Sequence, residues 1–117
     1  MTLLDVKIKI QLVANSNIAM GPGKADLLEA IQQKGSISAA ALSMRMSYKR
    51  AWDLVSVMNK SFKHALISTT VGGGKGGGAQ VTEFGLQILA QYRAIEAKAD
   101  LVVKNEAKEL MQKLIGR

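Results

Sequence analysis

The residues of this chain whose types and spacing suggest chemistry lie in two nearby stretches of its middle part. Ser47, Tyr48, Lys49 and Arg50 are consecutive, and a tract of glycines around a lysine follows at residues 72–78. Hydroxyl groups and cations at the start of a helix can contact phosphates and the edges of bases. Glycines let a backbone approach an anion closely and expose its N–H groups. Together these stretches predict a surface that binds a polyanion.

The positive charge of the chain is concentrated around the same two stretches. The 117 residues carry a formal charge of +7, and residues 34–75 hold seven lysines and arginines against the single acid Asp53. A basic surface confined to one part of a chain is the electrostatic footprint of nucleic-acid binding. Lys60 is one of these cations, and we expect it to contact DNA as well.

Composition excludes several kinds of site. The chain has no cysteine, which excludes disulfides, thiol catalysis and thiolate metal sites. Its single histidine, His64, has no carboxylate cluster near it in sequence, so it predicts neither a metal site nor a catalytic triad. No apolar run approaches the length of a membrane span or forms a signal-peptide core. We therefore expect a soluble cytoplasmic protein that is not an enzyme and has no metal and no cofactor.

Hydrophobic periodicity predicts the elements that precede the cationic residues. The apolar residues between 6 and 12 alternate with polar ones, which predicts a half-buried strand. Residues 14–23 contain a Gly-Pro-Gly sequence and are expected to form a loop. A helix follows, and Gly35 is its expected C-terminal stop.

Two consecutive helices are expected to hold the cationic residues. Either Ser36 or Ser38 caps a short alanine-rich helix that runs to about Met46, and Ser47 caps the next helix. The apolar residues of this second helix recur at helical spacing and predict an inward stripe, and we place Trp52 in the core with them. The stripe consists of Ala51, Leu54, Val55, Met58 and Phe62.

The first turn of that second helix is expected to point its polar side chains toward solvent. Arg50 can bind a guanine or a phosphate through its guanidinium group, whereas Lys49 is better suited to a phosphate. Tyr48 can donate its hydroxyl to a phosphate or pack on a sugar. Asp53 would repel phosphates, so we expect it to pair with Lys49 or Arg50; the alternative is to accept a hydrogen bond from the amino group of a cytosine.

The last part of the chain predicts a hairpin and a long helix. Residues 67–82 are expected to form the hairpin, and residues 83–115 contain no proline and have a helical pattern. A helix of that length would span about 50 Å, so its apolar stripe extends beyond one small domain. We expect a two-fold dimer that buries the stripe. The alternative is a helix that breaks near residues 98–100 and folds back.

The residues described so far carry a resemblance to a known family. Residues 27–62, together with residues 72–96, closely resemble the N-terminal domain of ModE-type molybdate-responsive transcriptional regulators. The chain is more distantly similar to the winged helix of LysR-type regulators. The resemblance covers about residues 3–100 and implies a winged helix-turn-helix that dimerises and binds a palindromic operator. By position it assigns Ser38 to the start of the first motif helix, residues 47–50 to the recognition helix and residues 72–78 to the wing.

The chain departs from the family at two points. Arg45 stands where the turn of the motif normally has glycine, and a left-handed conformation there would cost a non-glycine residue roughly 1–2 kcal/mol. The full-length regulators also carry C-terminal oxyanion-binding domains, which the residues up to Arg117 cannot form. We therefore expect that molybdate does not bind this chain.

These arguments predict a mainly α fold with a small β-sheet. A winged helix-turn-helix domain would occupy residues 1–82, with an N-terminal strand and a wing at residues 67–82, and a C-terminal dimerisation helix would occupy residues 83–117. The expected function is that of a transcriptional regulator that binds double-stranded DNA as a homodimer, with no membrane partner. The alternatives are a winged-helix protein-interaction module and, less favoured, a small oxyanion-binding protein. The expected DNA-binding residues are Ser38, Arg45, Ser47, Tyr48, Lys49, Arg50, Lys60, Gly74, Lys75 and Gly76.

Overall fold

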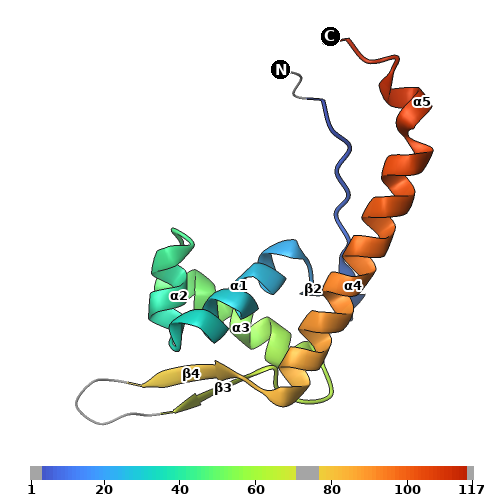
Figure 1. Ribbon diagram of the computed structural model, residues 1–117. Coiled ribbons are helices and arrows are strands. Elements are labelled where there is room, and N and C mark those ends of the chain that lie inside the picture. The colour runs from blue at the N-terminus through green and yellow to red at the C-terminus, as the bar shows by residue number, and fades with distance from the viewer. Residues whose placement is uncertain (1–3, 71–76, 116–117) are drawn as a thin grey trace.

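A computed structural model describes residues 4–70 and 77–115 of the chain and shows a mainly α fold with two small antiparallel sheets (Figure 1). The predicted class of fold, mainly α with little β-structure, is therefore confirmed. The elements in chain order are β1 (Leu12–Ala14), β2 (Asn17–Met20), α1 (Pro22–Lys34), α2 (Ile37–Ser43), α3 (Tyr48–Ser61), β3 (Ile67–Thr70), β4 (Gly78–Val81), α4 (Glu83–Glu106) and α5 (Lys108–Met111).

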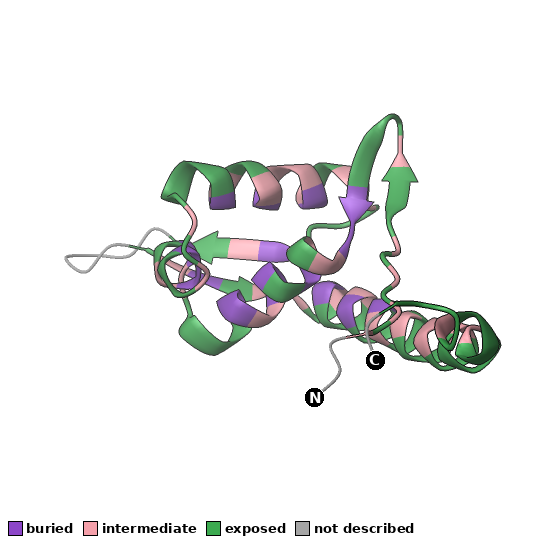
Figure 2. Cartoon of the chain, turned by 90° about the horizontal axis from the view of Figure 1, so that it is seen from above, coloured by how far each residue is buried: buried purple, intermediate pink, exposed green. Residues whose placement is uncertain are grey.

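The hydrophobic core lies between the first three helices and the strands next to them. Helix α1 packs against α2, α3, β4 and α4, and α3 packs against β2. Figure 2 shows that the buried residues gather in this part of the chain, whereas most of α4 is exposed or half-buried. The largest fully buried side chains are Tyr92, Met20, Leu27, Leu28, Ile31, Met58, Leu66 and Val55.

Hydroxyl side chains cap three of the helices. Ser36 rather than Ser38 caps α2, since its hydroxyl oxygen accepts a 3.1 Å hydrogen bond from the amide of Ala39. Ser47 caps α3 in the same way, as predicted, by accepting from the amide of Arg50 at 3.0 Å. Thr82 caps α4. These caps satisfy N–H groups that have no partner within the helix.

The N-terminal strand predicted over residues 6–12 is wrong. Residues 4–11 run beside α4 and pair with no strand in the described part of the chain, and β1 begins only at Leu12 (Figure 1). The predicted loop over residues 14–23 is wrong in part, because it contains β2. Asn15 and Ser16 have φ values of 50° and 71°, and this positive-φ pair closes a two-residue hairpin turn between the two strands.

The side chain of Asn59 connects the end of α3 to the start of the second hairpin. Its Oδ1 accepts hydrogen bonds from the amides of Leu66 at 2.8 Å and of Ile67 at 3.1 Å, and its Nδ2 donates to the carbonyl oxygen of Ile67 at 3.0 Å. One amide group therefore satisfies three backbone groups where the chain leaves α3 and enters β3.

The predicted long C-terminal helix is confirmed over most of its length. Helix α4 is continuous through residues 98–100, so the alternative of a break and fold-back there is wrong. The helix ends at Glu106, and the short helix α5 follows. In the first turn of α4, an added Cβ at Gly85 would clash with the carbonyl oxygen of Leu66 and lie 2.7 Å from Cγ1 of Val81. Glycine at this position lets α4 pack directly on the hairpin.

Candidate nucleic-acid interface

The first turn of α3 presents its polar side chains to solvent, as predicted. Tyr48, Lys49 and Arg50 are all exposed and follow the capping residue Ser47. The ring of Tyr48 packs edge-on against Trp52, with 6.2 Å between the ring centroids. Trp52 itself is only partly buried, at the edge of the core. The interpretation of Trp52 as a core residue is therefore correct only for part of its surface.

Lys49 is held by an acid one turn further along the helix. Its Nζ lies 3.2 Å from Oδ2 of Asp53, which confirms the predicted pairing of that aspartate. Both side chains are largely exposed, at 84% and 65%, so the pair contributes little to stability. Its main effect is to keep the negative charge of Asp53 next to a cation on the exposed face of α3.

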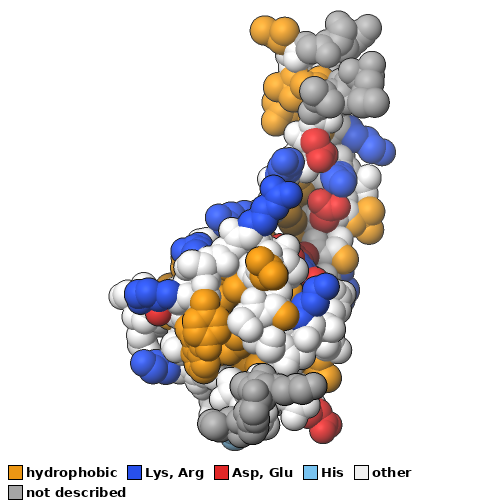
Figure 3. Space-filling view, turned by 90° about the vertical axis from the view of Figure 1, so that its left-hand side faces the viewer, with side chains coloured by type: hydrophobic (Ala, Val, Ile, Leu, Met, Phe, Trp, Pro, Cys, Tyr) orange, Lys and Arg blue, Asp and Glu red, His pale blue; other side chains and the backbone are white. Residues whose placement is uncertain are grey.

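A cavity of about 420 Å³ lies between α2, α3 and the second hairpin. It brings Ser38 and Tyr48 together with Ser36, which was considered only as a helix cap, and with Thr69 and Thr70, which the sequence did not single out. In Figure 3 basic side chains flank the apolar surface at this end of the molecule, and most of the visible acidic side chains lie on the long helix. Hydroxyl groups bordered by cations are suited to hydrogen bonding with phosphate oxygens.

The turn between α2 and α3 has the left-handed residue that its sequence suggested. Arg45 has a φ of 58° and an exposed side chain, and α2 ends at Ser43 rather than near Met46 as predicted. The amide of Met46 donates to the carbonyl oxygen of Ala41 across this turn at 3.0 Å. The turn therefore reverses the chain as a glycine would, with the strain of a non-glycine residue at positive φ.

Two groups of predicted residues do not join this surface in the described structure. Lys60 lies twelve positions after Tyr48, about 18 Å further along the helix axis, where it borders the turn of the first hairpin. The remaining predicted residues lie outside the described part of the chain: Gly74, Lys75 and Gly76.

Arg50 faces a different cavity from Tyr48. It lines a cavity of about 230 Å³ together with Lys9 and Lys24, which come from the N-terminal segment and the first turn of α1. Partial burial and the nearby charge of Arg50 both lower the pKa of Lys24, burial having the larger effect. Sequence analysis missed both lysines, although Lys24 follows directly on a Gly-Pro-Gly sequence that predicts a change in chain direction.

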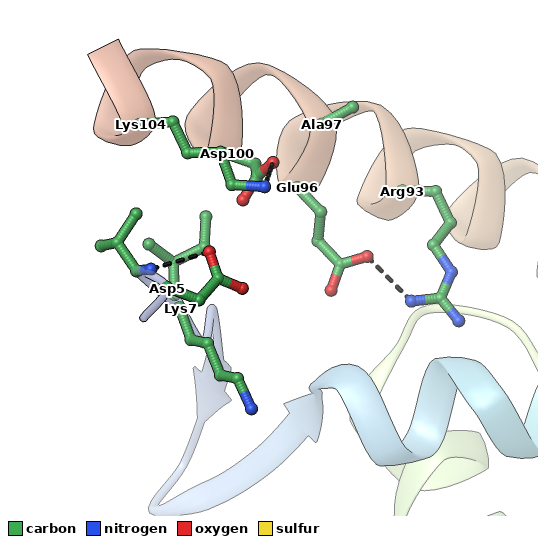
Figure 4. Close-up of a pocket in the computed structure, with 9 residues that line it drawn as sticks. Asp5, Lys7, Arg93, Glu96, Ala97, Asp100 and Lys104 are labelled. Carbon is green, nitrogen blue, oxygen red and sulfur yellow. Dashed lines mark hydrogen bonds and ion pairs between the residues drawn. The ribbon is translucent and has the colours of Figure 1, made fainter. Parts of the chain in front are cut away.

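A further cavity, of about 470 Å³, lies between residues 5–8 and α4 (Figure 4). On its α4 side Arg93 pairs with Glu96, and Lys104 pairs with Asp100. Glu96 and Asp100 therefore lie on an ion-paired face of α4. Because the charges are already balanced, this cavity is a poor site for an anion.

Arg93 also connects α4 to α1. Its guanidinium group lies 2.7 Å from a carboxylate oxygen of Asp26 and 3.0 Å from one of Glu29. The hydrogen bond with Glu29 is the main cause that raises the pKa of Arg93, and burial opposes it. These contacts fix the angle at which α4 leaves the domain.

The described residues contain no group of three or more side chains that could hold a metal ion. His64 packs edge-on against Phe84 with 5.1 Å between ring centroids, as part of the structure rather than of a reactive site. No helix in the described ranges is long and apolar enough to cross a membrane.

Comparison with known proteins shows a consistent set of relatives. The "Molybdenum transport protein ModE" of Azotobacter vinelandii is 38% identical over 82% of this chain, and the "DNA-binding transcriptional dual regulator ModE" of Escherichia coli K12 is 37% identical over 77%. The chain is ModE-like. The "Molybdenum-pterin-binding protein MopB" of Rhodobacter capsulatus is 42% identical over 78% of the chain. No protein-family model matches the chain.

The ModE-like chain spans only about a third of the length of these relatives, with 36%, 32% and 34% of them covered. None of the three is named as an enzyme, which agrees with the non-enzymatic function expected from the sequence. The expectation that molybdate does not bind this chain is wrong, because a relative with 42% identity is named for binding a molybdenum compound.

Proposed function

We propose that this chain is the DNA-binding part of a ModE-like transcriptional regulator. The observation that carries the proposal is the first turn of α3, where Tyr48 and Lys49 are exposed beside a hydroxyl-lined cavity and a hairpin. In this proposal α2, its turn and α3 form a helix-turn-helix. Residues 67–82 form the wing of a DNA-binding domain that spans residues 1–82.

The polar groups around α3 suit the two kinds of contact that DNA offers. The start of a recognition helix enters the major groove, so Tyr48 and Lys49 would face the bases and the adjoining phosphates. Ser36, Ser38 and Thr70 would donate hydroxyls to phosphates on the side of the hairpin. Arg45 would place its guanidinium near the backbone from the turn.

Dimerisation through the region of residues 83–117 is the second part of the proposal. The outward apolar side chains of α4 and α5 include Leu101 at 65%, Val102 at 59% and Leu110 at 66% exposure. A second copy of the chain would bury this stripe and present two recognition helices to successive major grooves of a palindromic operator.

The test is the salt dependence of binding to duplex DNA. If about five cations per protomer contact phosphates, a dimer releases roughly ten counterions, and log K falls with log salt at a slope near −9. We expect Lys49→Gln to reduce the magnitude of the slope. The matched change Lys63→Gln, just beyond the C-terminal end of α3, should leave the slope close to that of the wild type. A flat salt response would remove the DNA proposal and favour the protein-interaction module.

Binding of an oxyanion is a second candidate function, favoured by the name of MopB. A basic domain of this size can hold a tetrahedral anion where cations converge without acids. Equilibrium dialysis of the purified chain against sodium molybdate tests it, with the absence of retained molybdenum as the contrary outcome.

A further inference from the structure

Three basic side chains from three separate segments line one cavity of the molecule. Lys9 comes from the N-terminal segment, Lys24 from the first turn of α1 and Arg50 from the first turn of α3. The rest of the lining is glycine, proline, glutamine and apolar side chains, so no acid faces the cavity. In the described part of the chain, none of the three cations forms an ion pair with an acid.

This arrangement is unfavourable without an anion. Like charges that share a cavity repel each other, and the reduced pKa of Lys24 reflects partial burial together with the charge of Arg50. An anion in the cavity would replace this repulsion with attraction to all three groups. What distinguishes these three cations is that they line one cavity whose other lining residues include no acid.

The walls of the cavity are suited to a small anion with several oxygen atoms. Arg50 can donate two parallel hydrogen bonds and each lysine can donate to a further oxygen. Met44, Met46 and Leu54 form the apolar part of the wall, which strengthens electrostatic attraction relative to open water. An added Cβ on Gly23 would meet nothing within 4 Å, so the space in front of α1 is open.

We propose that Lys9, Lys24 and Arg50 form a binding site for a tetrahedral oxyanion, supplied either by a phosphate of bound DNA or by a free anion such as phosphate or molybdate. The DNA form of the site rests on the proposed function. In either form Arg50 binds an oxyanion rather than a base, and base recognition is left to the rest of the first turn of α3.

The first experiment measures free anions. Isothermal titration of the full chain with sodium phosphate and with sodium molybdate should give binding that weakens roughly tenfold in Lys24→Gln and in Arg50→Gln, the expected effect of losing a charge-assisted hydrogen bond. The matched control Lys63→Gln removes one positive charge just beyond the C-terminal end of α3 and should bind as the wild type does. Circular dichroism of each variant checks that it folds.

The second experiment measures DNA. If the anion is a backbone phosphate, Lys24→Gln and Arg50→Gln should weaken specific and random duplexes to a similar extent and each reduce the salt slope by about 0.9 per protomer. A duplex with one neutral methylphosphonate at the contacted position should then make the Lys24→Gln change nearly silent, because the two changes remove the same contact.

The outcomes separate this site from the DNA-binding function. Wild-type affinity of both variants for duplexes and for free anions would overturn the site and leave DNA binding intact. Loss of anion binding in the variants of a chain that binds no duplex would support the site and remove the DNA proposal. A wild-type chain that binds neither anions nor duplexes would overturn both.

Discussion

The hydroxyl of Tyr92 donates a 2.8 Å hydrogen bond to the backbone carbonyl oxygen of Ile10, across 82 positions of sequence. Tyr92 is buried in α4, and Ile10 belongs to the N-terminal segment that pairs with no strand in the described ranges. This contact therefore fixes residues 4–11 against α4, and with them Lys9 at the edge of the three-cation cavity.

Replacing Tyr92 with phenylalanine should destabilise the fold. The change keeps the ring in the core but leaves the carbonyl oxygen of Ile10 without its donor, at a cost of about 1–3 kcal/mol. The free energy of unfolding in urea measures the effect. Tyr48→Phe is the matched control, since its side chain is 54% exposed, and it should change the stability little. Equal stabilities of the two variants would contradict the role of the Tyr92 hydroxyl.

The same residue predicts a loss of stability at high pH. Burial, followed by the negative charge of Glu96, raises the pKa of Tyr92 to about 12 from its ordinary value of 10.0. The folded state therefore keeps the proton between these values while the unfolded state releases it. The contribution of Tyr92 is fully present below pH 10 and is lost as pH rises through 12. Urea unfolding across this range should show a steeper decline for the wild type than for Tyr92→Phe.

Gly85→Ala should destabilise the contact of α4 with the second hairpin. The new methyl group would clash with the backbone of Leu66, which cannot move as a flexible side chain can. We expect a loss of about 1–3 kcal/mol, typical of overpacking. Gly23→Ala provides a matched control in α1, where the methyl group has open space and should be neutral or slightly stabilising. A thermal melt of both variants decides whether the close approach at Gly85 matters.

Two substitutions of Arg45 separate its backbone strain from its charge. Arg45→Gly relieves the cost of positive φ and should raise the free energy of unfolding by a few tenths to about 1 kcal/mol, after the entropy of glycine is subtracted. Arg45→Ala removes the same charge without relieving the strain and should not stabilise. Both variants should lower DNA affinity by similar amounts if the guanidinium contacts phosphate; unequal losses would indicate that the turn geometry itself is required.

Polar replacements on the outward face of α4 should prevent dimerisation. Leu101 and Val102 are exposed and contact no core residue, so Leu101→Ser with Val102→Ser should leave the fold intact and weaken self-association. Sedimentation at tens of micromolar measures the change, and Asn105→Ser in the same helix is the control. A monomeric wild type would contradict the proposed dimer, as would a double variant that dimerises normally.

Local sequence patterns predicted the three central helices because their signals are local. Ser47 and Gly35 mark helix boundaries through their own backbone hydrogen bonds and φ, which depend on few distant residues. Alternation over residues 6–12 indicated one buried face but not what covers it, and here α4 takes the place of a neighbouring strand. Asn15, which readily adopts positive φ, was the available signal for the missed first hairpin.

The candidate site was predicted in part for the same reason. The exposed first turn of α3 follows from helical periodicity and from a capping residue next to it. The grouping of Lys9 and Lys24 with Arg50 depends on how three segments pack, and no spacing in the sequence encodes that packing directly.

Asn59 gives the domain a mechanical property. Its side-chain amide accepts hydrogen bonds from the backbone N–H groups of Leu66 and Ile67 and donates one to the carbonyl oxygen of Ile67. The start of β3 therefore cannot tilt relative to the end of α3 without breaking these hydrogen bonds. The helix and the base of the hairpin therefore move as one rigid body. A ligand that seats against both meets a surface of fixed span and need not expend binding free energy on closing a hinge.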